Sequence, residues 1–127
     1  MLIRSVTLLF IIALAISWSC GDFCNVYDVQ KIDGLAGGNA IVAYVVRCGA
    51  TGHNSISVTW KKKDLDLKGK RGEIFYAIDG DDIKIERISA DSVKIYYLAW
   101  DVKVKKELAR GITFIYEAKG LEFFEKE

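Results

Sequence analysis

Residues 41–60 read IVAYVVRCGATGHNSISVTW, and this stretch decides the fold. The continuous apolar run at residues 41–46 is typical of a central β-strand, and the alternation at residues 56–60 is typical of a strand with one buried face. The polar segment between them supplies glycines, which a tight connection between two strands requires. The stretch therefore predicts a β-hairpin whose turn spans residues 47–52.

The same two signals continue along the chain and predict an all-β fold. Further apolar or alternating stretches lie at residues 74–78, 83–88, 93–97 and 112–116. Consecutive strands joined by short turns pair as antiparallel neighbours, so we expect a meander of about six strands that forms a small sandwich or a partly open barrel. A chain of 127 residues with 51% hydrophobic residues has material for one such domain.

Four segments between or beside these strands have less regular patterns. We expect part of residues 25–39 to form an irregular edge strand, and the tail at residues 121–127 to form a short strand. In residues 99–110, Trp100, Val102 and Val104 alternate as in a strand, whereas Val104 and Leu108 could share a helical face. We expect an extended, exposed hairpin arm. Residues 79–82 read Asp-Gly-Asp-Asp, which predicts a hairpin turn, because the spaced ligands and distant glutamate of a calcium loop are missing.

The amino terminus has the layout of a secretory signal. One arginine precedes an apolar run at residues 6–16, and a helix over residues 5–18 would span about 21 Å, too little for a bilayer core of about 30 Å. Two cleavage outcomes follow: a cut after Ala15 would release a soluble secreted protein, whereas a cut before Cys20 would yield a lipoprotein. We therefore divide the chain into a signal helix (1–19), a lipid-anchored lead-in (20–39) and a single β domain (40–127).

The three cysteines have an odd count for an exported protein, which would leave one of them unpaired. Lipidation of Cys20 resolves this, because Cys24 and Cys48 then remain as one disulfide pair in an oxidising compartment. The alternative is a bridge between Cys20 and Cys24, with Cys48 buried and free.

Three short motifs carry a resemblance to a known family. They are Cys-Gly-Asp-Phe-Cys at residues 20–24, Arg-Cys-Gly-Ala-Thr at residues 47–51 and Gly-Ile-Thr-Phe-Ile-Tyr at residues 111–116. Together they resemble a family of small bacterial lipoproteins that is known only as a domain of unknown function. The resemblance implies a lipidated Cys20 and a bridge between Cys24 and Cys48. Gly52 departs from the family, in which a second threonine is common at this position.

The charges nearly cancel, at a net charge of +1, so no overall field favours nucleic acid as a partner. Residues 60–71 form a local exception, with six lysines and arginines beside a tryptophan. Such a stretch is either a solvated loop or a contact for anionic lipid headgroups. We expect no nucleic-acid partner, no cofactor and no metal.

The turn at residues 47–52 holds the candidate functional residues. Cys48 and His53 could form a nucleophile and its base, but no third orienting group is evident and an oxidising compartment opposes a free thiolate. Arg47, Thr51 and His53 are candidate binding residues, since a disulfide staple requires none of them. We expect Arg47 to pair with a carboxylate or to stack on Tyr44 or Trp60. A surface formed by Tyr96, Tyr97 and Trp100 is a further candidate, although strand alternation predicts that Tyr97 packs in the core.

These features predict an exported, lipid-anchored protein of a bacterial envelope that acts as a non-enzymatic binding or structural module. It would lie outside the cytoplasmic membrane, or in the outer membrane or periplasm, with the membrane and another envelope protein as candidate partners. Two alternatives stay open: a small thiol enzyme or hydrolase that uses Cys48 and His53, and a soluble secreted β protein cleaved after Ala15.

Overall fold

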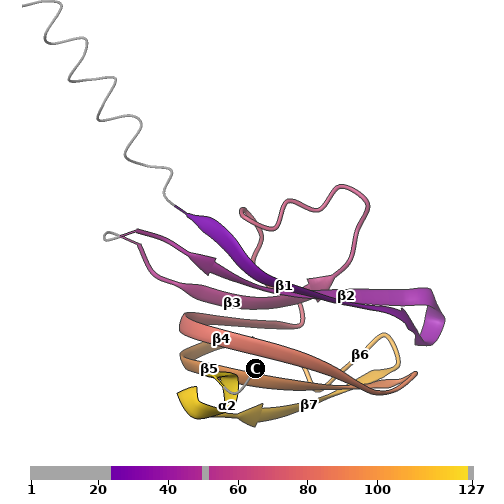
Figure 1. Ribbon diagram of the computed structural model, residues 1–127. Coiled ribbons are helices and arrows are strands. Elements are labelled where there is room, and N and C mark those ends of the chain that lie inside the picture. Colours follow the sequence, from indigo (N-terminus) through magenta and orange to yellow (C-terminus); the bar gives the residue numbers. More distant parts are fainter. Residues whose placement is uncertain (1–23, 50–51, 126–127) are drawn as a thin grey trace, which may run out of the picture.

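The computed structural model describes residues 24–49 and 52–125 (Figure 1). This part of the chain is mostly β, which confirms the predicted fold class. The signal helix expected at residues 1–19 lies outside the described residues. The elements are β1 (Asn25–Leu35), η1 (Ala36–Gly38, a 3₁₀ turn), β2 (Asn39–Arg47), β3 (Ser55–Trp60), β4 (Phe75–Ser89), β5 (Ser92–Lys105), β6 (Leu108–Ala109), β7 (Ile112–Ala118) and the helix α2 (Leu121–Glu125).

The described strands form one seven-stranded sheet in the order β1-β2-β3-β4-β5-β7-β6. Strands β1 to β5 pair as the expected antiparallel meander. The prediction that all neighbours are antiparallel is wrong for β7, which pairs with β5 in parallel. A short connection suffices because the far end of β5 curls back to β7: Tyr116 Oη donates a hydrogen bond to the Lys106 carbonyl at 2.6 Å, and Phe114 N donates to the Glu107 carbonyl at 2.9 Å.

The sheet curls around one hydrophobic core. In Figure 1, β1, β2 and β3 lie above, and β4, β5 and β7 lie below. The two halves meet through their inward-facing side chains, and the rings of Trp60 and Phe114 contact edge to face at 6.1 Å between centroids. The buried core consists of Leu35, Ile41, Ala43, Val45, Ile56, Val58, Trp60, Ile74, Phe75, Ala77, Ile83, Ile85, Val93, Ile95, Ile112 and Phe114. A single curled sheet around this core has the form of a partly open barrel.

Side chains close the gap between β1 and the distal half of β4. Gln30 Nε2 donates to the Ile83 carbonyl at 2.7 Å, and the Ile85 N–H donates to Gln30 Oε1 at 3.0 Å. Arg87 Nη2 donates to the Gly34 carbonyl at 2.7 Å. Strand β1 also has two register shifts against β2, which confirms the expectation of an irregular edge strand.

The hairpin turn predicted at residues 79–82 is wrong, because β4 continues through it as one strand. The structure has a register shift there between Gly80 and Asp82, which is a β-bulge. Asp79 adopts a left-handed backbone with φ of 58°, and Gly80 lies so close to Ile56 that a Cβ atom would sit 2.8 Å from Ile56 Cγ1. The bulge bends β4, so that its first part pairs with β3 and its second part lies beside Gln30.

Two further expectations are corrected at the C-terminal side. Residues 99–105 extend β5 and pair with residues 75–80 of β4, so they do not form a separate hairpin arm. Trp100 and Leu108 are nevertheless exposed, as expected for this segment. The tail forms helix α2 in place of a strand, because one helical turn brings the Phe123 ring to 4.8 Å from the Tyr96 ring between centroids.

The loop between β3 and β4 covers the outer face of β2. Leu65 and Leu67 pack against a second cluster made of Val42, Tyr44 and Val46. Tyr44 is fully buried there, its Oη donates to the Lys70 carbonyl at 2.9 Å, and burial raises the pKa of its hydroxyl. The loop is therefore attached to the sheet. Its cations Lys68, Lys70 and Arg71 lie near Cys24, which precedes β1, whereas Lys61 pairs with Asp33 further along β1.

Candidate functional site

A disulfide joins Cys24 and Cys48. It lies at the end of the β1–β2 pair, next to the first paired residues Asn25 and Arg47. The predicted bridge is thereby confirmed, and the alternative bridge between Cys20 and Cys24 is wrong. Because Cys48 is bridged, it has no thiol that could act as a nucleophile.

The turn that follows Cys48 is compact. Gly52 N donates to the Gly49 carbonyl at 2.9 Å, and Cys48 N donates to Asn54 Oδ1 at 3.3 Å. A side chain at Gly52 would collide with the Cys48 Cβ atom, so this position requires glycine. The candidate binding residue Thr51 lies outside the described residues.

Arg47 is engaged by β1 and by the bulge of β4. Its guanidinium carbon lies 5.2 Å from the Tyr27 ring centroid, and its Nη2 donates to the Asp81 carbonyl at 3.3 Å. The predicted stacking on Tyr44 or Trp60 is wrong, because the loop between β3 and β4 covers Tyr44 and the Arg110 guanidinium covers the Trp60 ring at 4.3 Å. Arg47 thus links the stapled end of the sheet to the bulge, while its side chain stays exposed.

His53 points to β4 and does not serve Cys48. Its Nδ1 lies 2.9 Å from Asp79 Oδ1, and the two side chains are 76% and 54% exposed. The left-handed backbone of Asp79 belongs to the bulge, so the bulge sets where this carboxylate meets the imidazole. The partner of His53 is therefore Asp79, a residue of the segment for which the sequence predicts a hairpin turn.

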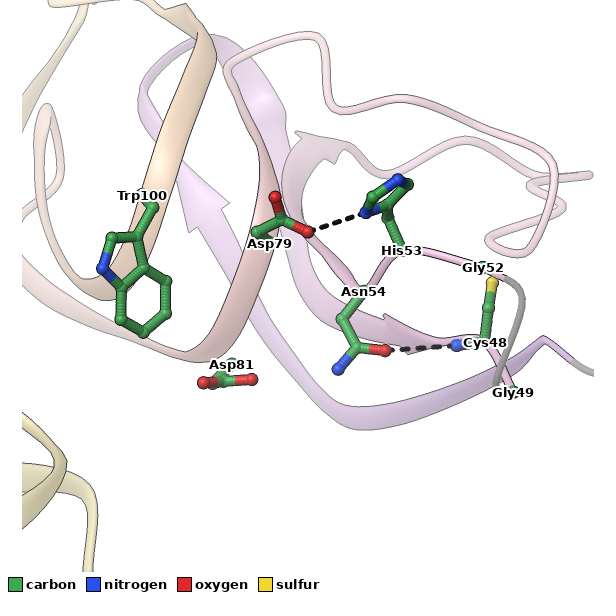
Figure 2. Close-up of a pocket in the computed structure, with 8 residues that line it drawn as sticks. All are labelled: Cys48, Gly49, Gly52, His53, Asn54, Asp79, Asp81 and Trp100. Atoms are coloured by element: carbon green, nitrogen blue, oxygen red, sulfur yellow. Dashed lines mark hydrogen bonds and ion pairs between the residues drawn. The ribbon is translucent and has the colours of Figure 1, made fainter.

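An open depression of about 520 Å³ lies between the stapled turn, the bulge of β4 and strand β5. Figure 2 shows the Trp100 indole on one side and the His53 imidazole on the other, with the carboxylates of Asp79 and Asp81 between them. Trp100 is 71% exposed. The lining residues are Cys48, Gly49, Gly52, His53, Asn54, Asp79, Asp81 and Trp100. The depression thus combines a flat aromatic surface with two carboxylates.

The neighbouring Asp82 belongs to the same bulge but faces a more enclosed environment. Burial raises the pKa of its carboxyl above the ordinary value, the Arg47 guanidinium opposes this shift, and the negative charges of Asp28 and Asp81 add to it. Within residues 24–49 and 52–125, no group of three or more side chains is arranged to hold a metal ion. The positive charge of Arg47 thus offsets part of the negative charge of the aspartates around the bulge.

The other predicted aromatic candidates have structural partners. Tyr97 packs against the core as predicted, with its ring 5.0 Å from that of Phe75 between centroids. Tyr96 lies under Phe123 of α2. Trp100 therefore lines the depression without them. One sequence signal could have indicated Trp100 as a site residue. It is a large aromatic in an alternating segment that was not expected to be buried, and the chain also contains a cluster of aspartates at residues 79–82.

The fold and this site define a disulfide-stapled all-β protein with an open, acidic and aromatic depression beside the staple. Comparisons with protein-family models, with curated proteins and with solved structures find no match. No helix in the described part of the chain is long and apolar enough to cross a membrane.

Proposed function

We propose that the protein is exported, anchored by a lipid on Cys20, and acts as a non-enzymatic module that binds an envelope partner with its stapled end. The observation that carries this proposal is the bridge between Cys24 and Cys48. It leaves Cys20 as the odd cysteine of the chain, directly after a segment with the layout of a secretory signal. A lipidated Cys20 accounts for that remaining thiol.

The position of the bridge supports a membrane-proximal role for the stapled end. Cys20 precedes Cys24 by four residues, and a chain of that length spans at most about 14 Å. Cys24 shares a groove of about 360 Å³ with residues 68–71 of the loop between β3 and β4, which include Lys68, Lys70 and Arg71. Cations at this place suit a surface of anionic headgroups.

The depression supports binding as the activity of this end. Its walls come from three separate segments: the Arg47 contact joins the stapled turn to the bulge of β4, and strand pairing joins the bulge to β5. The bridged Cys48 favours binding over thiol chemistry. The same geometry explains why a turn of this kind contains a cysteine and an arginine: both fix the rim of the depression.

Metabolic labelling with an alkyne fatty acid tests the anchor. Wild type should incorporate the label and sediment with membranes, whereas Cys20→Ala should do neither. The matched control is the double variant Cys24→Ala, Cys48→Ala, which removes the bridge and should keep the label. Unlabelled wild-type protein in the soluble fraction would support the alternative cut after Ala15 and contradict the anchor.

Photo-crosslinking in intact cells tests the binding end. A photoreactive residue in place of His53 should give one major protein adduct. The control position is Leu108, which is 69% exposed and lies beside β7, at the end of the sheet where Arg110 bonds Asn39. Equal adducts at both positions, or none at His53, would show that the stapled end is not the binding surface.

A further inference from the structure

We propose that the depression binds an organic cation, that is, an ammonium or guanidinium group, between the Trp100 ring and the carboxylates of Asp79 and Asp81. This inference rests on the proposed binding role of the stapled end and names the chemistry that the end would recognise. The cation could be carried by a small amine or by a basic side chain of a partner protein.

No described residue covers the ring of Trp100. The solvent-accessible aromatic rings elsewhere in the described chain lie against a cation or another ring. Cations cover the rings of Tyr27, Trp60, Tyr76, Tyr96, Tyr116 and Phe123. Trp100 is 71% exposed and makes no such contact with any described residue. Tryptophan is the side chain whose face attracts cations most strongly, so its open face is an unused cation site.

The depression that Trp100 lines also carries negative charge. The carboxylate of Asp81 has no hydrogen bond or ion pair with any described residue. The neighbouring Arg47 bonds the backbone carbonyl of Asp81 and not its carboxylate. The Asp79 carboxylate contacts His53. No lysine or arginine lines the depression. Two carboxylates next to an aromatic face attract a cation and repel phosphate or carboxylate ligands.

The size of the depression also suits a small cation. A volume of about 520 Å³ lies within the range of small-ligand sites, which is roughly 300 to 1,000 Å³. The depression is broadly open to solvent, so a group at the end of a chain can enter while the rest of its carrier stays outside. We therefore expect weak, millimolar binding of a small cation, and tighter binding when a partner surface adds contacts.

Titration followed by the ¹⁵N-labelled indole signals tests the proposal on the full chain in a nonionic polyoxyethylene detergent, which contains no ammonium group. Tetramethylammonium should shift the Trp100 indole signal in a saturable manner. Trp60 is the internal control, because it is 4% exposed and already covered by Arg110, so its signal should stay in place. The neutral probe tert-butanol has a similar shape and should cause less than a fifth of the Trp100 shift.

Variants locate the charge contribution. Asp81→Asn and Asp79→Asn should each weaken tetramethylammonium binding at least threefold. Asp101→Asn is the matched control, because it follows Trp100 directly and its carboxylate pairs with Lys103 at 3.1 Å, so affinity should not change. Unchanged dispersion of the amide spectrum shows that each variant is folded.

Two further probes distinguish the sources of the cation. Butylammonium represents a small amine, and the peptide acetyl-Gly-Lys-Gly-amide represents a partner side chain. Binding of the peptide at least tenfold tighter than butylammonium would support a protein partner, and equal binding would support a small amine. The proposal is overturned if tetramethylammonium causes no saturable shift, if tert-butanol shifts Trp100 equally, or if Asp81→Asn has no effect. Fatty-acid labelling and crosslinking at His53 would still succeed in that case, so failure of this inference is distinct from failure of the proposed function.

Discussion

The side-chain amide of Gln30 pairs with the backbone of Ile85 as a neighbouring strand would. The Ile85 N–H donates to Gln30 Oε1 at 3.0 Å, while Gln30 Nε2 donates to the Ile83 carbonyl at 2.7 Å. The distal half of β4 pairs with β5 on one side and is not paired with β3 on the other. Gln30, together with Arg87, therefore closes the gap through which the curled sheet would otherwise open.

Replacement of Gln30 tests this closure. Gln30→Ala removes both hydrogen bonds and leaves the backbone groups of Ile83 and Ile85 without that partner, so we expect a loss of about 1–3 kcal/mol in the free energy of unfolding. Lys31→Ala is the control, because this exposed neighbour should change stability by less than about 0.5 kcal/mol. Urea titration measures both. Equal stabilities of the two variants would show that Gln30 does not hold β1 to β4.

Gly80, in the bulge of β4, should tolerate no side chain. A Cβ atom at this position would lie 2.8 Å from Ile56 Cγ1 in the core, so Gly80→Ala should lower the free energy of unfolding by about 1–3 kcal/mol. Gly120→Ala is a matched control, since nothing lies within 4 Å of its Cβ position. Thermal unfolding of the two variants compares them directly. A Gly80→Ala variant as stable as the control would mean that β4 does not bend here as described.

The local sequence pattern predicts the all-β class and the central strands, and it favours the staple. The runs at residues 41–46 and 56–60 have strong period-two or continuous apolar patterns, and they form β2 and β3. The bridge between Cys24 and Cys48 was favoured over a Cys20–Cys24 bridge by the parity of three cysteines, by the expected export and by the family resemblance.

The errors arose where contacts distant in sequence override a local signal. Asp79 and Gly80 form a favourable turn pair, but the close approach of Ile56 turns this pair into a bulge. The curl of β5, which allows its parallel pairing with β7, has no local signature. The depression has no local signature either: Trp100 and His53 are 47 positions apart in the chain and line opposite sides of it, with the bulge between them.

Asp82 should make stability fall as the pH rises. Burial raises the pKa of its carboxyl in the folded state, so the folded protein holds this proton more tightly than the unfolded chain, whose aspartates titrate near about 3.9. The free energy of unfolding that this group contributes is therefore fully present below that value. It is lost as the pH rises through the folded pKa.

The variant Asp82→Asn isolates this effect. The free energy of unfolding of the variant, relative to that of wild type, should be more favourable at pH 7 than at pH 3. At pH 7 the wild type must carry a partly buried charge on Asp82, and the variant carries none. Urea titrations of both proteins at the two pH values measure the difference. If the relative stability is the same at pH 3 and pH 7, or is more favourable at pH 3, the Asp82 carboxyl does not titrate in the way described.

The proposed function requires that Cys24 and Cys48 staple the sheet and leave Cys20 for the lipid. Peptide mass spectrometry under non-reducing conditions tests it most directly on wild-type protein isolated from cells. We predict a fragment in which Cys24 is linked to Cys48, together with a diacylglycerol mass on Cys20. A link between Cys20 and Cys24 with an alkylatable Cys48 would contradict the account.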